Sequence, residues 1–248
     1  KNKEMEKDND WFESWFNSDY YHLLYKNRSQ NEANLFIENL IQSFSLSKKN
    51  KILDLGCGKG RHAYKMSQYF EHVDGLDLSE KNIEKAKKFV APNLKFQIGD
   101  MRNFNLSNRY NYIFNLFTSF GYFKNINQNI DVLKCCHSHL YKDGFLLIDY
   151  LNSEQISNQS MKEEIKKING IIFKTKKTIE NNFVIKNISI FDKAKEHNYC
   201  EKVQLFDKEQ FKEMLKESGF KLMSYFGNYQ LNEFNKNSER LIMWAKKI

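Results

Sequence analysis

The sequence has little of several features that define whole classes of protein. Its 248 residues contain one proline, four cysteines and no apolar run near the ~18 residues that a membrane-spanning helix needs. The cysteines, Cys57, Cys135, Cys136 and Cys200, lack the paired Cys-x-x-Cys spacing of zinc sites, and the two adjacent ones do not suit a disulfide with each other. We expect no metal site. This cysteine usage predicts a reducing, cytoplasmic setting. Because the first ten residues are nearly all charged or polar, we also expect no signal peptide.

Arginine is also scarce, although the chain is basic. Lysine and arginine number 39 against 31 acidic residues, a formal net charge of +8. Only five of the basic residues are arginine, whose fork suits phosphate, and the lysines are interleaved with acidic and amide residues, as in residues 163–167. This pattern favours a solvent-exposed charged surface over a nucleic-acid-binding surface. We therefore expect a small-molecule partner, with nucleic acid and membrane disfavoured.

The spacing of apolar residues divides the chain into a helical N-terminal part and a part in which strands and helices alternate. Residues up to about 44 show helical spacing of apolar side chains, whereas residues 51–151 alternate short apolar strands with helices. Such alternation is typical of a mainly parallel sheet with helices on both faces, an α/β fold. The expected strands are 51–55, 72–76, 94–98, 110–116 and 145–151, and the expected helices between them are 61–70, 80–89 and 126–140.

The alternation of predicted strands and helices ends after Asn152. Residues 171–177, 182–191 and 198–205 read as strands without helices between them, which predicts an antiparallel insertion that serves as a lid or as the surface of a homodimer. A helix over 208–217 and strands over 220–226 and 241–245 follow. We therefore expect an N-terminal helical cap over 1–45, a core made of 46–152 and 206–248, and an inserted β unit over 153–205.

A glycine-rich turn follows the first strand directly. The string Asp54-Leu-Gly56-Cys-Gly58-Lys-Gly60 joins that strand to a helix, an arrangement that lets backbone approach a nucleotide-like ligand. A nicotinamide dinucleotide fingerprint, Gly-x-Gly-x-x-Gly, would place its last glycine at position 61. Arg61 stands there instead, which disfavours a nicotinamide oxidoreductase.

Acidic residues end the next two strands. Asp77 can accept hydrogen bonds from ribose hydroxyls, or it can simply complement the dipole of the following helix. Asp100 can accept from the exocyclic amine of adenine while Met101 packs on the ring, or it can cap its own turn.

Together, Asp54, the three glycines, Asp77 and Asp100 resemble the motifs of class I S-adenosylmethionine (SAM) dependent methyltransferases. The resemblance implies a Rossmann-like, doubly wound, seven-stranded sheet of order 3-2-1-4-5-7-6 with an antiparallel last strand. It also implies SAM as cofactor and S-adenosylhomocysteine as product.

The segment after the fourth strand narrows the resemblance. Asn115-Leu-Phe-Thr-Ser-Phe-Gly-Tyr122-Phe123 lacks the prolines of nucleic-acid amino-methyltransferases and resembles the Phe-Ser-Ser-x-Gly-Tyr loop of small-molecule N-methyltransferases, such as those acting on amino sugars. Its bulky residues suit a pocket wall: Phe117, Phe120, Tyr122 and Phe123. Alternatively Phe117 and Phe120 belong to the core, as we expect for Phe114 on the preceding strand. The segment Tyr20 to Arg28 resembles the helix that covers the cofactor in that group.

The resemblance implies roles for particular residues. Arg28 pairs with the cofactor carboxylate; Tyr25 contacts the cofactor or packs against its own helix. Tyr21, Tyr122 and His62 are the catalytic candidates, although His62 suits orientation better than proton transfer. The implied cofactor site consists of Tyr25, Arg28, Asp54, Gly56, Cys57, Gly58, Gly60, His62, Asp77, Leu78, Asp100, Met101, Arg102, Asn115, Leu116 and Phe117.

We interpret the chain as a methyltransferase that aligns a small-molecule nucleophile with the S–CH3 bond of SAM. Orientation of this kind contributes ~7–11 kcal/mol. N-methylation is favoured, with O-methylation open. Two alternatives are an RNA or protein methyltransferase, which the basic charge favours, and a SAM-binding protein without turnover. The inserted β unit carries no motif that identifies the acceptor.

Overall fold

The computed structural model describes residues 11–26, 29–158 and 163–248. Its central strands are β1 (Lys51–Leu55), β2 (His72–Asp77), β3 (Leu94–Ile98), β4 (Tyr110–Asn115), β5 (Leu140–Leu151), β10 (Phe220–Phe226) and β11 (Arg240–Lys247). They form a seven-stranded sheet of order β10-β11-β5-β4-β1-β2-β3. The neighbours among β1 to β5 pair in parallel, and β11 runs antiparallel to both β5 and β10. The predicted α/β fold and strand order are confirmed.

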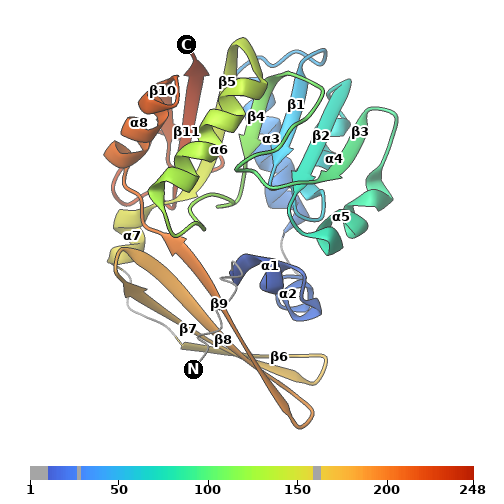
Figure 1. Cartoon of the computed structure of the whole chain (residues 1–248), viewed down its shortest axis with the longest axis vertical. Coiled ribbons are helices and arrows are strands. Elements are labelled where there is room, and N and C mark those ends of the chain that lie inside the picture. The colour runs from blue at the N-terminus through green and yellow to red at the C-terminus, as the bar shows by residue number, and fades with distance from the viewer. Residues whose placement is uncertain (1–10, 27–28, 159–162) are drawn as a thin grey trace, which may run out of the picture.

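Helices cover both faces of this sheet, and its central strands β1 and β2 are buried on both sides (Figure 1). They are α3 (Gln30–Ser43), α4 (Arg61–Ser67), α5 (Glu80–Ala86), α6 (Ile126–His139) and α8 (Lys208–Glu217). One apolar cluster joins the sheet to α6 and α8, and a second joins it to α3 and α4. Phe114 is buried in the second cluster, as expected.

Side-chain caps fix where two helices begin. Ser79 accepts a hydrogen bond from the backbone N–H of Asn82, and Asp207 and Gln210 form a reciprocal capping box at α8. The predicted helix over 80–89 is an α-helix to Ala86 that tightens into the 3-10 turn η1 (Lys87–Phe89). The chain therefore turns just before Pro92.

The start of β5 differs from the expected strand over 145–151. The strand begins at Leu140, directly after α6, and its pairing with β4 shifts register between Leu140 and Phe145. The residues between them, which read as a turn, form an irregularity in which Asp143 takes a positive φ of 61°. Asp143 and Gly144 are residue types typical of turns, so the sequence does not distinguish this irregularity from a loop.

The inserted β unit is a four-stranded antiparallel sheet. It contains β6 (Glu163–Ile168), β7 (Ile171–Glu180), β8 (Phe183–Asp192) and β9 (Lys195–Gln204), in that order, and the helix α7 (Ser153–Ser157) leads toward it. Helix α7 and strand β6 were not predicted. Strand β6 carries four charged residues in six and has a mostly exposed surface, so it shows no apolar alternation.

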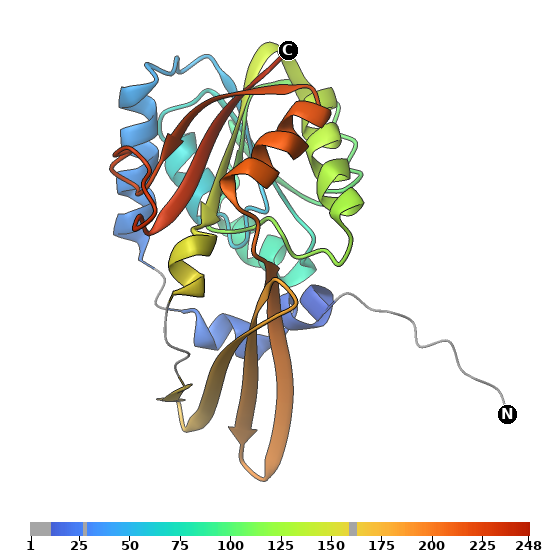
Figure 2. The same cartoon turned by 90° about the vertical axis from the view of Figure 1, so that its left-hand side faces the viewer.

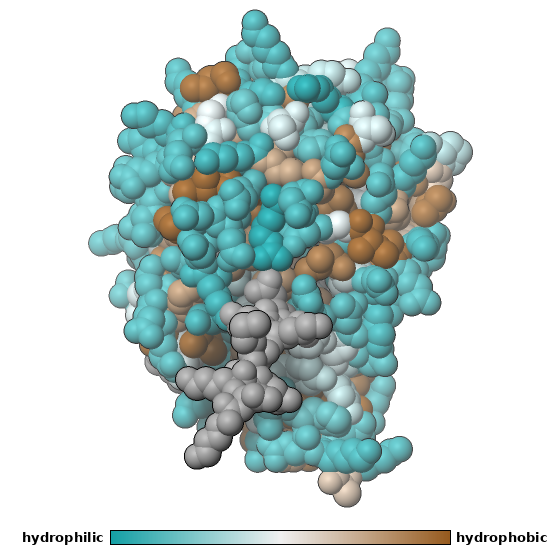
Figure 3. Space-filling model, viewed as in Figure 1, coloured by the Kyte–Doolittle hydropathy of each residue, from teal (hydrophilic) through white to brown (hydrophobic). Residues whose placement is uncertain are grey.

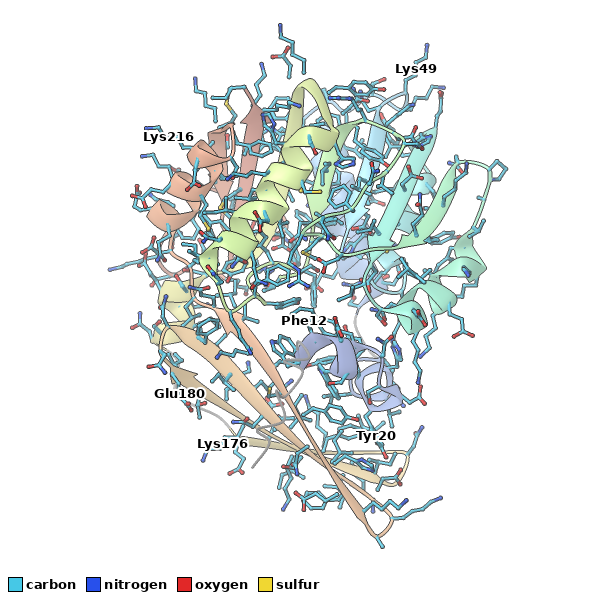
Figure 4. All side chains as sticks on the ribbon, in the orientation of Figure 1. Phe12, Tyr20, Lys49, Lys176, Glu180 and Lys216 are labelled. Carbon is cyan, nitrogen blue, oxygen red and sulfur yellow. The ribbon has the colours of Figure 1, made fainter. Side chains whose placement is uncertain are left out.

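Two short N-terminal helices lie between the two sheets. Helices α1 (Trp11–Phe16) and α2 (Asp19–Leu24) place Trp15 and Tyr21 against Phe173, Ile188 and Ile190 of the inserted sheet. Figures 1 and 2 show this sheet extending away from the core, with α1 and α2 filling the angle. Figure 4 places Phe12 of α1 in that angle.

The surface seen in Figure 3 is mostly hydrophilic, and its apolar residues are scattered in small patches. Of the helices that the structure describes, none has the length and apolar character to cross a membrane.

Candidate active site

A cavity of about 630 Å³ opens where the glycine turn, the loop after β4, helices α1 and α2 and the inserted sheet meet. Many of the predicted site residues line it: Tyr21, Tyr25, Gly56, Cys57, Gly58, His62, Asp77, Leu78, Asp100, Met101, Leu116, Phe117 and Tyr122. Four others, Asp54, Gly60, Arg102 and Asn115, lie behind this lining. Arg28 lies outside the described residues.

The glycine turn wraps around the end of β2. The backbone N–H groups of Gly56 and Cys57 both donate to the carbonyl oxygen of Leu76, at 2.8 and 3.0 Å. Gly58 has a φ of +56°, and a Cβ added to it would meet no atom within 4 Å, so its backbone is open to the cavity. A Cβ on Gly60, in contrast, would lie 2.7 Å from the Phe96 ring. Gly58 therefore exposes backbone, and Gly60 permits packing.

Asp77 holds this turn in place. Its carboxylate accepts from the backbone N–H groups of Gly58 and Ser79 and from the Asn82 side-chain amide, at 2.8, 2.9 and 3.0 Å. Burial raises the pKa of Asp77, while these three donors oppose the rise. A carboxylate offers about four acceptor positions. One position therefore remains for a ligand hydroxyl.

Asp54 lies beneath the turn and is 1% exposed. Burial raises the pKa of Asp54 to about 7, although a hydrogen bond from the Ala63 backbone favours the charged form. Behind the same turn, the Asn115 side chain donates to the Leu55 carbonyl at 2.9 Å. Both side chains support the turn from below.

Asp100 and Arg102 form a closed pair. The Arg102 guanidinium donates to both carboxylate oxygens, with contacts of 2.6 to 3.0 Å. The guanidinium also lies 4.8 Å from the centre of the Phe123 ring. Arg102 therefore orients the carboxylate from behind the cavity wall.

The loop after β4 is strained. Phe117 and Thr118 have φ angles of 57° and 56°, in the left-handed region that non-glycine residues rarely adopt. Phe117 donates its backbone N–H to the Asp149 carboxylate at 2.7 Å, and Thr118 donates its own to the Asp149 carbonyl at 2.9 Å. Such strain persists only where the surroundings over-determine the backbone.

A buried ion pair supports that loop. Arg240 donates to the Asp149 carboxylate and to the Thr118 hydroxyl, at 2.7 and 2.8 Å. Tyr229 adds a third hydrogen bond to Asp149, at 3.0 Å. The Asp149 side chain is 1% exposed and that of Arg240 is 19% exposed. Arg240 itself lines the cavity, so the network connects the strained loop to the site.

Aromatic side chains close the cavity from the N-terminal side. Tyr122 lies 5.4 Å from Trp11 and 5.6 Å from Phe16, measured between ring centres, and its hydroxyl donates to the Thr118 carbonyl. Phe12 packs edge-on to Phe123 at 5.7 Å. Of the expected bulky residues, Phe117, Tyr122 and Phe123 line the cavity. Phe120 instead lies in the core.

The inserted sheet supplies the remaining wall. Tyr25 donates its hydroxyl to Glu201 at 2.6 Å and accepts a hydrogen bond from Lys186 at 2.8 Å. The Trp15 indole also donates to Glu201, at 2.8 Å. Burial lowers the pKa of Lys186, and the charge of Glu201 partly offsets this. Tyr25 is thus held by the sheet through its hydroxyl.

Comparison with known proteins accounts for this arrangement. Residues 46–224 match the family described as "Methyltransferase domain". The chain belongs to this methyltransferase family. It is a SAM-dependent enzyme, as the glycine turn and the strand-end acids predicted.

Relatives and solved structures agree with this assignment. The methyltransferase is 27% identical over 214 residues to YqeM, a proposed methyltransferase of Bacillus subtilis, covering 82% of this chain and 86% of that one. It is 28% identical over 134 residues to a dTDP-3-amino-3,4,6-trideoxy-alpha-D-glucopyranose N,N-dimethyltransferase of Streptomyces venezuelae, covering 53% and 56%. SAM-bound CalS10, an amino pentose methyltransferase of Micromonospora echinaspora, superimposes with a TM-score of 0.72 at 19% identity over 93% and 98%.

Sequence reasoning missed several residues of the methyltransferase site. Asp149 left a visible signal, because it interrupts the apolar run of β5. Arg240, one of only five arginines, lies at the start of the last strand. Lys186 and Glu201 left no comparable signal, since lysine and glutamate are common throughout the inserted sheet.

Proposed function

We propose that this methyltransferase moves a methyl group from SAM to the amine nitrogen of a small molecule, with an amino sugar as the acceptor class. The observation that carries the proposal is a cavity that joins the glycine turn to the aromatic wall and the inserted sheet. Its size and enclosure suit a small acceptor beside the cofactor. The amino-sugar methyltransferases among its relatives support the same class.

The residues present fit SAM. We propose that Asp77 accepts from one ribose hydroxyl through its remaining acceptor position, and that Asp100 accepts from the adenine amine while Met101 packs on the ring. The open backbone at Gly58 leaves room for the methionyl part. When bound, SAM supplies an electrophilic methyl group on a positively charged sulfur.

The chain's own contribution is orientation of the acceptor. Tyr122 lines the cavity, and donation to the Thr118 carbonyl fixes the position of its hydroxyl, so we propose that it helps to hold the acceptor amine. An amine held in this way presents its lone pair to the methyl carbon as the C–S bond breaks. Tyr21 and His62 also line the cavity and remain candidates for removing the proton that the amine gives up.

A methyl-transfer assay tests the proposal. The protein and SAM are incubated with matched acceptors that carry an amine or a hydroxyl at the same sugar position, both free and nucleotide-linked, and products are followed by mass spectrometry. Methylation of the amine series alone supports the proposal. Turnover confined to the hydroxyl series, or to RNA or protein substrates, contradicts it. Pairing of two copies through the inserted sheet and a cytoplasmic location stay predictions.

A further inference from the structure

Three charged residues form one row across the inner face of the inserted sheet. Lys177 of β7 pairs directly with Lys186 of β8, and Lys186 pairs directly with Glu201 of β9. All three line the cavity. Their neighbours on the same face are mainly apolar, with Phe173, Ile188 and Ile190 two to four residues along the strands.

A directly opposed lysine pair is unfavourable for folding. Like charges opposite each other on neighbouring antiparallel strands repel, and here the repulsion is added to the cost of burying Lys186. Among the ion pairs within 4 Å that the described residues form, neither Lys177 nor Lys186 takes part. Residues that break a local rule without compensation in the fold are typical of binding sites.

Glu201 carries one negative charge, so it can balance at most one of the two lysines. Its Oε1 atom already accepts from Trp15 and from Tyr25, at 2.8 and 2.6 Å. Lys186 gives one of its three donors to the Tyr25 hydroxyl at 2.8 Å. The chain Glu201–Tyr25–Lys186 therefore fixes the position of the ammonium group and leaves two of its donors for the cavity.

The other acids near the two lysines already have partners. The charge of Glu164 on β6 also acts on Lys186, but Glu164 is paired with Lys166 at 3.0 Å. Asp77 is bound to the glycine turn, and Asp100 is bound to Arg102. SAM brings a carboxylate, an ammonium and a sulfonium, so it adds a net positive charge. We therefore expect the remaining ligand of the cavity to supply a counter-charge for the second lysine.

We propose that Lys177 and Lys186 bind an anionic group of the methyl acceptor, a phosphate ester or a carboxylate. Tyr25 and Glu201 act as positioning residues for Lys186. This inference rests on the proposed function, because it assigns the end of the acceptor that lies away from the reacting nitrogen.

Titration with simple anions tests the site without turnover. Pyrophosphate and malonate are titrated by calorimetry, at constant ionic strength, into the S-adenosylhomocysteine-loaded wild type and into the Lys177→Gln and Lys186→Gln variants. We expect the dissociation constant of the bound anion to rise about tenfold in each variant. The preferred anion distinguishes a phosphate from a carboxylate. Lys176→Gln is the matched control, because Lys176 lies next to Lys177 in β7 on the opposite face (Figure 4).

Either of two results overturns the inference: no anion binds the loaded wild type, or binding weakens equally in the Lys176 control. Neither result touches the amine assay, so the proposed function can stand without this site. Thermal unfolding gives an independent readout. In the absence of anion, Lys177→Gln should match or exceed the wild-type melting temperature, since a repulsion is removed. A clear fall would show that the lysine serves the fold and would also overturn the inference.

Discussion

Arg240 and Asp149 are joined by a 2.7 Å hydrogen bond beneath the strained loop after β4. The pair connects the start of the last strand to the interior of β5, and through Asp149 it holds the backbone of Phe117 and Thr118. A buried carboxylate thus keeps two unfavourable φ angles in place on the wall of the cavity.

Replacing Arg240 by methionine should be costly. The Asp149 carboxylate would keep its hydrogen bonds from Phe117 and Tyr229 but lose its counter-charge while remaining buried. We expect a loss of about 3–5 kcal/mol in the free energy of unfolding, measured by urea denaturation, together with weaker SAM binding. Arg109→Met is the control, because Arg109 is exposed, and it should change stability by less than about 0.5 kcal/mol. Equal stability of the two variants would contradict the role given to the pair.

Replacing Asp77 by asparagine should weaken cofactor binding. An amide has one acceptor oxygen, so the backbone N–H groups of Gly58 and Ser79 would compete for it and the turn would lose one hydrogen bond. We expect the dissociation constant of SAM to rise at least about tenfold by calorimetry. Asp131→Asn, an exposed change on α6, should leave it unaltered. An unchanged SAM affinity in the Asp77 variant would rule out its assigned role.

Asp54 should make stability fall as pH rises. Burial raises its pKa to about 7 in the folded state, above the ordinary aspartate value of 3.8. Between these values the folded chain holds a proton that the unfolded chain releases, so this group's contribution is lost as pH rises through about 7. Asp54→Asn should flatten the profile by up to about 1.4 kcal/mol per pH unit, measured by chemical denaturation from pH 4 to 8. Parallel profiles for variant and wild type would contradict this.

His22 should act in the opposite direction. The ring is buried, neither of its nitrogens has a partner among the described residues, and burial lowers its pKa to about 4. The unfolded chain takes up a proton below the ordinary value of 6.5, so this contribution is complete above that pH and is lost as pH falls toward 4. His22→Phe should gain stability relative to wild type at pH 5 but not at pH 7.5. The comparison of melting temperatures at the two values decides it.

Periodic features of the sequence predicted most of the fold. The glycine turn, the strand-end acids and the apolar strands are local patterns, and strands β1 to β4 lie within one residue of their expected bounds. Strands β5, β7 and β9 each extend three or more residues beyond theirs at one end. Strand β6 and helix α7 were not predicted, because short polar or charged segments show no hydrophobic periodicity. The irregular start of β5 was not predicted, because Asp143 and Gly144 are equally typical of a turn.

Only part of the candidate site could be predicted from the sequence, for a different reason. Asp77 and Asp100 sit next to recognisable strand ends, so their place in the cavity followed from local pattern. The partnership of Arg240 with Asp149, and that of Glu201 with Tyr25, join positions 91 and 176 residues apart. No local pattern encodes a contact over such separations.

The two walls of the cavity come from different parts of the chain. One wall is built from residues close together in the sequence, from Gly56 to Met101, whereas the facing wall comes from the N-terminal helices and from an inserted sheet more than 150 residues later. Mutations can accumulate in the second wall without disturbing the first. In this architecture the wall formed by the inserted sheet can therefore vary while the glycine turn and the strands behind it are kept.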